Sequence, residues 1–260
     1  MSAVVFGLFG LIVGSFLNVL ILRYPERGVG GRSACMSCGT QIRWYDNVPV
    51  FSWLMLRGKC RDCHARISIQ YPLVEALVAI LFALIGGSTL ALPAQIAACM
   101  IAALLVAIAV YDFRHTVIPD PWVYAFALLA LFSQLLFGPH PDALTFLSGA
   151  IVAAPLFALW LYSRGAWMGF GDVKFAVGMG WLLGAVYGVA ALFLAFVVGA
   201  VVGVGLIAFT HTRTSAKGES GFTMKSEIPF GPFLVASTFI LWLLLIYAID
   251  PLLWTGLSPL

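Results

Sequence analysis

The sequence predicts an all-α polytopic membrane protein with about eight transmembrane helices and one small polar domain between the first two. Hydrophobic residues make up 62% of the 260 residues and charged residues only 10%, which excludes a soluble globular domain. Several apolar runs exceed about 18 residues, the length that spans a bilayer as a helix. The third observation is one long polar segment, 23–71, which holds four of the five cysteines.

The fourteen Lys and Arg residues predict the orientation of the helices. Eight of them lie in the polar segment, between Arg23 and Arg66, and the rest flank later apolar runs. None lies in the other inter-helix segments, near 86–93, 138–142 and 184–188. Because basic residues collect on the cytoplasmic side of membrane proteins, we expect 23–71 to be cytosolic and both termini to lie outside. The first span has no basic segment before it, so we expect no cleaved signal peptide.

The expected spans follow the apolar runs in order. The first covers 3–22 and is followed by the polar segment 23–71. Residues 72–260 then hold seven spans, at 72–90, 94–111, 121–138, 143–162, 172 to about Gly184, 188–210, and one that begins after Ile228-Pro229-Phe230-Gly231-Pro232 and ends near Asp250. The chain therefore divides into a first helix at 1–22, a cytosolic domain at 23–71 and a seven-helix core at 72–260.

Several polar or small residues sit within these spans. Gly7, Gly10, Gly14 and Asn18 lie near one stripe of the first span, a spacing typical of close helix packing; Asn18 could also reach a substrate or the cytosolic domain. Glu75 lies just inside the second span. We expect it to reach the membrane interface or to pair with a basic residue of the cytosolic domain.

Two loop features complete the chain. Asp120 precedes Pro121 at a helix start, so we expect it to be the N-cap. The basic loop 211–229 is expected to be cytosolic and mobile. The Pro229-x-Gly231-Pro232 turn predicts either irregular backbone beside a cavity or simply a helix start.

The cysteines of the polar segment form two CxxC pairs. Cys35 and Cys38 make the first pair, and Cys60 and Cys63 the second, with twenty-one residues between them. Zinc takes four tetrahedral thiolate ligands from such pairs, and a cytosolic segment this small needs a metal to fold. We therefore predict a small cytosolic zinc-binding domain whose closed, structural site leaves His64 as a neighbour, while Cys99 packs within the membrane.

Two carboxylates, Asp112 and Asp172, lie at the ends of apolar runs. Asp172 follows the glycines of Gly169-Phe170-Gly171, and the orientation argument places both acids at the same cytosolic edge. An aspartic protease needs one ionised carboxylate to activate water and one protonated carboxyl to polarise the scissile carbonyl. Either acid alone could instead cap or flank a helix.

The ordered motifs resemble those of the type IV prepilin peptidases, also called prepilin leader peptidase/N-methyltransferases. The resemblance runs through most of the chain and rests on several motifs. They are Gly14-Ser15-Phe16-Leu17-Asn18-Val19, the two cysteine pairs around Asp46-Asn47-Val48-Pro49, Tyr71-Pro72 with Glu75, Ile118-Pro119-Asp120, Gly169-Phe170-Gly171-Asp172-Val173-Lys174 and Ile228-Pro229-Phe230-Gly231-Pro232.

This resemblance implies an activity, a location and partners. Such an enzyme cleaves the basic leader from type IV prepilins or type II secretion pseudopilins at the cytosolic membrane face. It then methylates the new N-terminal residue with S-adenosylmethionine. Asp112 and Asp172 match the family's catalytic pair and the four cysteines match its metal positions, whereas no residues are assigned to methyl transfer. The implied setting is the bacterial inner membrane, with both termini periplasmic, membrane lipid as a partner and no nucleic acid.

Two other functions fit parts of the pattern. A carrier or channel would use Asp112 and Asp172 as proton or cation sites, although carriers favour inverted repeats and acids near the bilayer midplane. A membrane scaffold with a zinc module would not need Asp172 at all. Mass spectrometry of a precursor pilin incubated with the protein, read for leader loss and methyl gain, separates the three.

Overall fold

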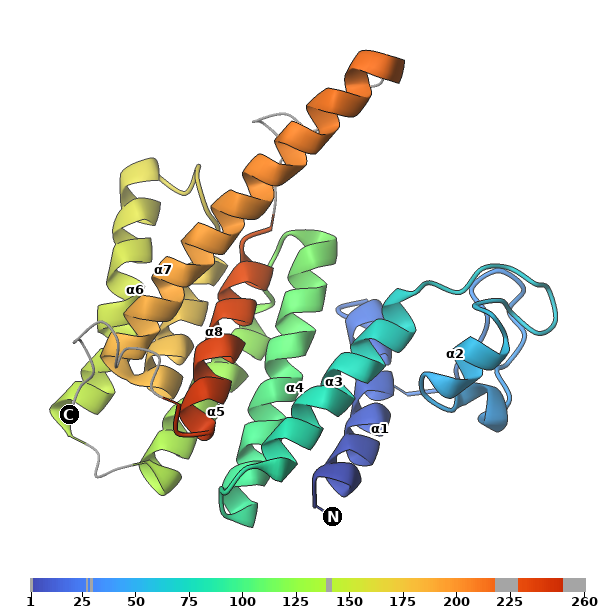
Figure 1. The fold of residues 1–260 in the computed structure, drawn as a ribbon, viewed down its shortest axis with the longest axis horizontal. Helices are drawn as coiled ribbons and strands as arrows, with labels where there is room; N and C mark the ends of the chain where they lie inside the picture. Colours follow the sequence, from blue (N-terminus) through green and yellow to red (C-terminus); the bar gives the residue numbers. More distant parts are fainter. Residues whose placement is uncertain (1, 27, 29, 139–141, 218–228, 250–260) are drawn as a thin grey trace. The chain divides into compact units, whose positions relative to one another are not determined.

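A computed structural model describes residues 2–26, 28, 30–138, 142–217 and 229–249, without the side chains of 207 and 209–217. Within these ranges the chain is helical, and its only β pairing is two isolated bridges, Ala34 with Gln41 and Lys59 with Arg66. The helices (Figure 1) are α1 Ser2–Arg23, the 3-10 helix η1 Trp44–Asn47, α2 Phe51–Met55, α3 Gln70–Gly87, α4 Leu92–His115, α5 Asp120–Phe137, α6 Ala143–Ser163, α7 Phe170–Lys217 and α8 Gly231–Ile246.

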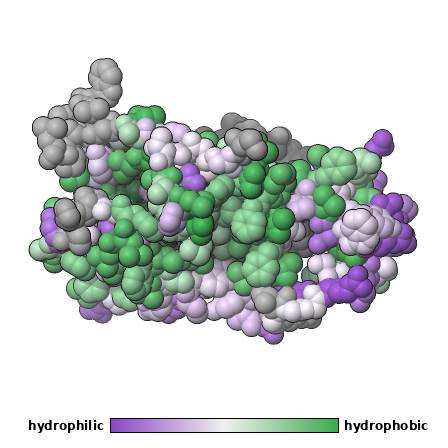
Figure 2. Space-filling view, turned by 90° about the horizontal axis from the view of Figure 1, so that it is seen from below, coloured by the Kyte–Doolittle hydropathy of each residue, from purple (hydrophilic) through white to green (hydrophobic). Residues whose placement is uncertain are grey.

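The long helices have the properties of membrane spans. Six of those described, α1 and α3 to α7, are long and apolar enough to cross a bilayer, and α8 is a shorter apolar helix. Large hydrophobic side chains stay exposed on them, as the space-filling view shows (Figure 2). An apolar exposed surface suits hydrocarbon rather than water. The predicted all-α membrane class is confirmed.

The chain forms two compact units, Met1–Ala107 and Ile108–Leu260, and the division falls within α4. In the first unit α1 packs along α3 through its glycines. A Cβ added at Gly10 would lie 2.8 Å from the Cα of Ala79, and one at Gly14 only 2.7 Å from the Cα of Glu75. Because no side chain fits at these distances, the glycine stripe is what lets the two backbones meet.

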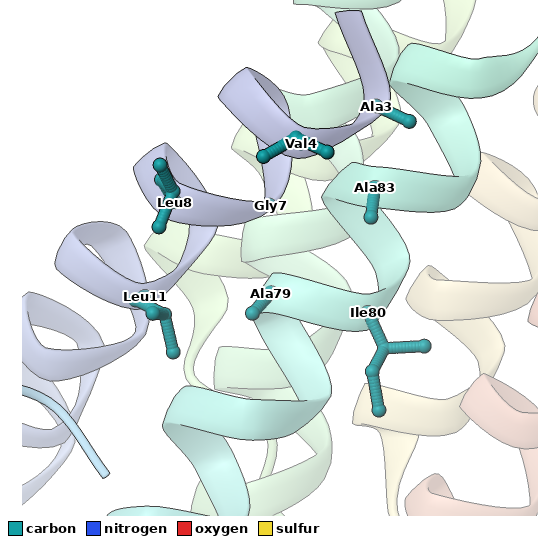
Figure 3. Close-up of a pocket in the computed structure, with 8 residues that line it drawn as sticks. All are labelled: Ala3, Val4, Gly7, Leu8, Leu11, Ala79, Ile80 and Ala83. Atoms are coloured by element: carbon teal, nitrogen blue, oxygen red, sulfur yellow. The ribbon is translucent and has the colours of Figure 1, made fainter. Parts of the chain in front are cut away.

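Near the N-terminal end of α1, the same helix pair forms a shallow groove of about 360 Å³ (Figure 3). The residues that line it are all aliphatic or glycine: Ala3, Val4, Gly7, Leu8, Leu11, Ala79, Ile80 and Ala83. A groove without a polar group offers nothing to hold or activate a reacting atom. It is therefore not a candidate active site.

In the second unit α7 is a helical hairpin. The first segment runs antiparallel to α6, since Phe170 packs on Trp160 while Trp181 Nε1 donates to the carbonyl of Phe146. The chain then reverses at Gly184, which has φ 78° and ψ 173°. A Cβ at Gly188 would lie 3.4 Å from the Cα of Gly180, whereas residues eight apart in one straight helix are separated by about 12 Å.

The hairpin accounts for the difference between the expected and observed elements. The spans predicted at 172–184 and 188–210 are the two segments of α7, which continues to Lys217, beyond the predicted loop start at 211. The rest of that loop, 218–228, and Asp250 lie outside the described residues. The last helix, α8, ends at Ile246.

Aromatic rings and small residues hold α5 and α8 against this hairpin. Phe126 of α5 stacks on Phe175 with ring centroids 5.0 Å apart. Phe196, on the second segment of α7, packs at 4.9 Å on Phe230, the residue that precedes α8. These contacts hold α5 against the first segment of α7 and the start of α8 against the second.

Candidate active site and metal centre

Asp112 lies in the last turns of α4 with only 4% of its surface exposed. Its Oδ2 accepts a hydrogen bond of 3.0 Å from the backbone N–H of Gly231, the first residue of α8. A Cβ at Gly231 would lie 2.5 Å from the same oxygen, closer than van der Waals contact allows. A residue without a side chain is therefore required for this hydrogen bond. The Pro-x-Gly-Pro turn is a helix start, and it also supplies this donor.

Asp172 lies in the first turn of α7 and is 8% exposed. Its N–H donates to the carbonyl of Gly169 at 3.3 Å, and a Cβ at Gly171 would meet the side chain of Ile118 at 3.0 Å. The two carboxyl groups interact electrostatically. The structure thus brings the two acids singled out in the sequence into one buried site, at the end of one helix and the start of another.

The neighbouring charges are engaged elsewhere. Lys174 forms an ion pair with Asp120 at 2.5 Å and lies over the rings of Tyr124 and Phe170. The prediction that Asp120 is an N-cap is wrong: Pro119 is the N-cap of α5 and Asp120 is its first residue, with no side-chain cap. An ion pair with a lysine 54 residues away has no local sequence signal, so helix-start statistics favoured the wrong role.

The four cysteines of the two CxxC pairs converge on one point. Their sulfur atoms all lie within 4.8 Å of one another, and those of Cys35 and Cys63 are 3.8 Å apart. A tetrahedron with zinc–sulfur bonds of about 2.3 Å has edges of about 3.8 Å. The sulfur arrangement therefore fits a single zinc ion held by Cys35, Cys38, Cys60 and Cys63.

The two halves of the metal centre have the same backbone design. Each is a tight turn closed on its first cysteine, by Gly39 N–H to the Cys35 carbonyl at 2.9 Å and by His64 N–H to the Cys60 carbonyl at 3.1 Å. Gly39 and His64 occupy equivalent positions, both with positive φ. Among the described residues the candidate metal cluster consists of the four cysteines and does not include His64, which follows Cys63 directly.

The surroundings favour thiolates at most of these positions. Backbone N–H groups lower the pKa of Cys35 and of Cys60, and the Thr40 hydroxyl lowers that of Cys38. The Ala65 N–H lowers the pKa of Cys63, but burial and the neighbouring sulfurs outweigh it and raise that pKa to about 12. A divalent cation among the sulfurs would overcome the raised pKa of Cys63, because a metal ion deprotonates a thiol that coordinates it.

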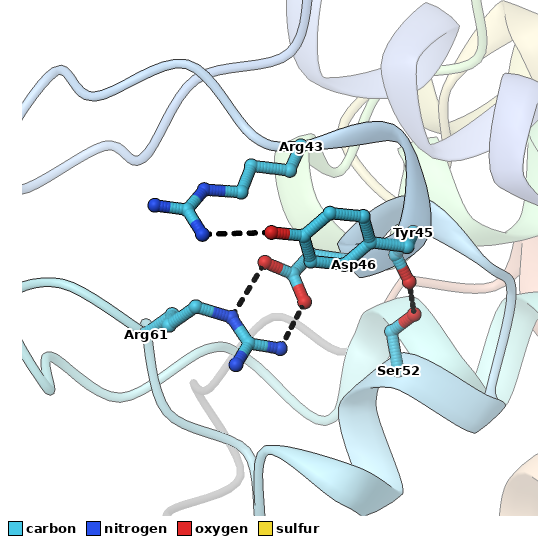
Figure 4. A network of polar contacts seen from close by, with 5 residues as sticks. All are labelled: Arg43, Tyr45, Asp46, Ser52 and Arg61. Carbon is cyan, nitrogen blue, oxygen red and sulfur yellow. Dashed lines mark hydrogen bonds and ion pairs between the residues drawn. The ribbon is translucent and has the colours of Figure 1, made fainter.

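A polar network supports the metal domain (Figure 4). Arg61 binds Asp46 through two hydrogen bonds of 2.9 and 2.6 Å, and this interaction holds the pKa of the Asp46 carboxyl below its usual value. Tyr45 receives a hydrogen bond from Arg43 at 2.7 Å, and the Arg61 guanidinium lies over its ring. The network ties the chain between the cysteine pairs to the second pair.

Glu75 and Asn18 occupy a second buried polar location, in the first unit. Among the described residues Glu75 forms no ion pair with a basic side chain, which was one of its expected roles. Its Oε2 instead accepts a 2.7 Å hydrogen bond from the backbone N–H of Val50. Asn18 is 1% exposed and donates to the Tyr71 carbonyl at 3.1 Å. Sequence reasoning missed Val50, because a backbone N–H carries no residue signature.

Comparisons with known proteins match the same group of proteins along most of the chain. Residues 8–88 match the model of the Bacterial Peptidase A24 N-terminal domain, and residues 99–204 match that of the Type IV leader peptidase family. The prepilin leader peptidase/N-methyltransferase of Aeromonas salmonicida is 32% identical over 90% of this chain and 89% of its own length. Proteins of the same name from Xanthomonas campestris and Burkholderia pseudomallei are 32% and 34% identical, over 90% and 87% of the chain and 88% and 80% of their own lengths. No solved structure matches.

Proposed function

The chain belongs to the type IV leader peptidase family, and from this premise we propose that it cleaves the leader from type IV prepilins or type II pseudopilins with Asp112 and Asp172, and N-methylates the product. The observation that carries the peptidase proposal is the single buried site in which these two carboxyl groups interact. Buried acids in a membrane protein are expensive and mark functional sites.

In the proposed mechanism one carboxylate takes a proton from water, and the resulting hydroxide attacks the scissile carbonyl carbon. The other carboxyl group donates its proton to the carbonyl oxygen, as paired aspartates do in aspartic proteases. The tetrahedral intermediate then collapses, the C–N bond breaks, and the leaving nitrogen takes a proton to become the new N-terminal amine. The Gly231 N–H supports this step by fixing the position of the Asp112 carboxyl group.

The membrane setting follows from charge. Arg114 and Lys174 each follow one of the two acids by two residues in the sequence, which supports cleavage at the cytosolic face of the inner membrane, with both termini periplasmic. Zinc at the cysteine cluster would serve folding, because four protein ligands leave no open position for catalysis.

The test uses purified enzyme and a precursor pilin, read by mass spectrometry. Asp112→Asn and Asp172→Asn should each slow leader removal by about 10²–10⁴-fold, the usual loss on removing an acid–base group. Asp120→Asn is the matched control: Asp120 is an exposed acid at the start of α5, paired with Lys174, and its loss should leave cleavage unchanged. Near-wild-type cleavage by a folded Asp112 or Asp172 variant would remove that residue from the mechanism.

The methyl donor proposed is S-adenosylmethionine. It rests on the N-methyltransferase in the relatives' names. The carrier alternative finds no further support, since both acids lie at helix ends. A proton-flux assay on the Asp172→Asn variant separates that alternative from the protease.

A further inference from the structure

Three carboxyl groups are buried among the residues that the structure describes: Asp112, Asp172 and Glu75. The first two form the proposed peptidase site. Glu75, 7% exposed, belongs to the other unit, and the proposed cleavage mechanism does not use it. It lies in residues 8–88, which match a family model separate from that of the peptidase part. A buried carboxyl at the end of a membrane helix needs a reason to be there.

The groups around Glu75 come from three parts of the first unit. Its Oε2 accepts the Val50 N–H at 2.7 Å, and the Ser15 side chain of α1 lies close enough to interact with its carboxyl group. α1 lies directly against it, because a Cβ at Gly14 would be 2.7 Å from the Glu75 Cα. The membrane helices and the metal domain therefore meet at this carboxyl group.

Asn18, near Glu75, has a buried side-chain oxygen that receives no hydrogen bond among the described residues. Its Nδ2 donates to the carbonyls of Gly14, at 3.3 Å, and Tyr71, at 3.1 Å, which fixes the orientation of the amide. Its Oδ1 is buried and has no hydrogen-bond partner among the described residues. Tyr71 precedes Glu75 by one turn of α3, so Asn18 of α1 contacts α3 one turn from Glu75. A buried carbonyl oxygen without a donor is costly, and a ligand with N–H groups would satisfy it.

The N–H group that donates to the Glu75 carboxyl group belongs to Val50, whose backbone conformation is strained. Val50 has φ 60° and ψ −51°, a conformation that a β-branched residue rarely adopts. Such strain persists where the surrounding structure holds it, and it clusters at functional sites. Here Glu75 holds it, so release of this one N–H from the carboxylate would let Val50 relax and leave the carboxylate free.

We propose that Glu75 and Asn18 bind the amine that is methylated, namely the new N-terminal amine of the cleaved pilin. This rests on the proposed N-methyltransferase activity and gives it a site. An ammonium group carries only donors, whereas a carboxylate and an amide oxygen offer only acceptors. The Val50 N–H stands in the place of one ammonium N–H until the substrate arrives.

The chemistry balances with a sulfonium methyl donor. The ammonium group gives one proton to the Glu75 carboxylate and becomes a neutral amine. The amine lone pair then forms the N–C bond to the methyl group as the S–C bond breaks, so that the sulfonium leaves as a neutral thioether and the product is a methylated ammonium. Glu75 returns its proton to water. The α-amine, with an ordinary pKa of about 7.7–8.0, needs only modest help from such a base.

The experiment follows leader loss and methyl gain on the same pilin in the same reaction. Glu75→Gln keeps an amide oxygen to accept the Val50 N–H but removes the charge and the base. We expect methyl transfer to fall by about 100-fold or more while leader cleavage stays at the wild-type rate. Asn18→Leu should raise the KM for the methyl acceptor and also leave cleavage unchanged. Gln95→Met, which replaces another buried amide of the first unit, should leave both activities unchanged.

A second substrate keeps this proposal separate from the peptidase proposal. Pilin whose leader has already been removed needs only methylation, so Asp112→Asn should methylate it at the wild-type rate whether or not Asp112 cleaves peptides. Wild-type methylation by Glu75→Gln would overturn the assignment. Equal losses of cleavage and methylation would also overturn it, because they would show that Glu75 only joins the metal domain to the helices.

Discussion

The buried carboxyl groups of Asp112 and Glu75 accept hydrogen bonds from backbone N–H groups rather than from charged side chains. Gly231 donates to Asp112 across 119 residues of sequence, and Val50 donates to Glu75 across 25. A backbone donor needs no counter-charge in the membrane and cannot rotate away, so it defines the position of a carboxyl group better than a flexible lysine would.

Gly231 gives the sharpest prediction at this scale. Gly231→Ala adds a methyl group that would lie 2.5 Å from the Asp112 Oδ2, so the carboxyl group or the start of α8 must shift. A displacement of about 1 Å at a catalytic group costs about 10²-fold in rate, and we expect leader cleavage to fall by that order. The measurement is single-turnover cleavage of a precursor pilin.

The control for this prediction is Gly199→Ala. A Cβ at Gly199 would meet Phe233 at 3.5 Å, an ordinary contact, so cleavage should persist. Alanine also favours helix more than glycine does, so a lower helix propensity cannot explain a loss at Gly231. Full activity of Gly231→Ala would show that the Asp112 position tolerates the shift.

The residues proposed to carry chemistry were visible in the sequence, but their partners were not. Asp112, Asp172 and the four cysteines stand out because acids and paired thiols are rare in an apolar chain. Gly231 and Val50 act through the backbone, which every residue has, and Lys174 meets Asp120 only because α5 and α7 pack together. Partners of this kind are defined by the tertiary fold, so local sequence patterns do not contain them.

At the scale of elements, the cysteine turns give a prediction about metal. One zinc ion per chain should be bound, and Cys60→Ser should lose it and expose residues 23–71 to protease, because metal binding in so small a domain is folding free energy. Acid should release the metal as well, since Cys35, Cys38 and Cys60 bind it as thiolates and protonation removes them as ligands. Metal analysis with limited proteolysis measures both effects.

Cys99→Ser is the matched control for the metal. Cys99 is a buried thiol of α4 outside the cluster, so its loss should leave the zinc content unchanged. Protein purified without chelator that holds no zinc, with all four thiols of the cluster free to titrate, would exclude the metal centre.

The reversal within α7 gives a second prediction for an element. Gly184 has φ 78° and ψ 173°, a conformation essentially restricted to glycine. Gly184→Ala should therefore destabilise the protein by about 1–3 kcal/mol, seen as a lower thermal midpoint in detergent. Gly205→Ala, at a helical glycine with open space around it, should be neutral or slightly stabilising. Equal midpoints for the two variants would mean that the chain can reverse without this conformation.

Hydrophobic runs and charge-free gaps predicted the number of helical segments well, because both follow directly from the thickness of the bilayer. The separation of 172–184 from 188–210 was predicted from such a gap, and the structure places the reversal at Gly184 within it. Helix ends were less predictable. The continuation of α7 to Lys217 crosses polar residues, so hydropathy gives no signal for it.

At the scale of the whole molecule, the two compact units correspond closely to the two family models, which end at residue 88 and begin at residue 99. Asp112 and Asp172 belong to one unit, and the metal centre and Glu75 to the other. The proposed division of labour, with cleavage in one unit and methylation in the other, follows this separation. The predicted domain boundary at 71–72 remains a prediction.

The orientation of the molecule in the membrane is the last prediction, and it rests on charge alone. The segment between α3 and α4 has no Lys or Arg, whereas the segment between α4 and α5 follows Arg114. The positive-inside rule therefore places Thr89 in the periplasm and Val117 in the cytosol. Both side chains are exposed, so a cysteine at either position should react with a maleimide that reaches it.

In spheroplasts, a membrane-impermeant maleimide should label Thr89→Cys, and Val117→Cys should react only after the inner membrane is opened. The wild-type protein is the control: Cys99 is buried and the other cysteines lie in the segment predicted to be cytosolic, so it should stay unlabelled from outside. The reverse pattern would put Asp112 and Asp172 at the periplasmic edge, where a cytosolic leader could not reach them, and would contradict cleavage at the cytosolic face.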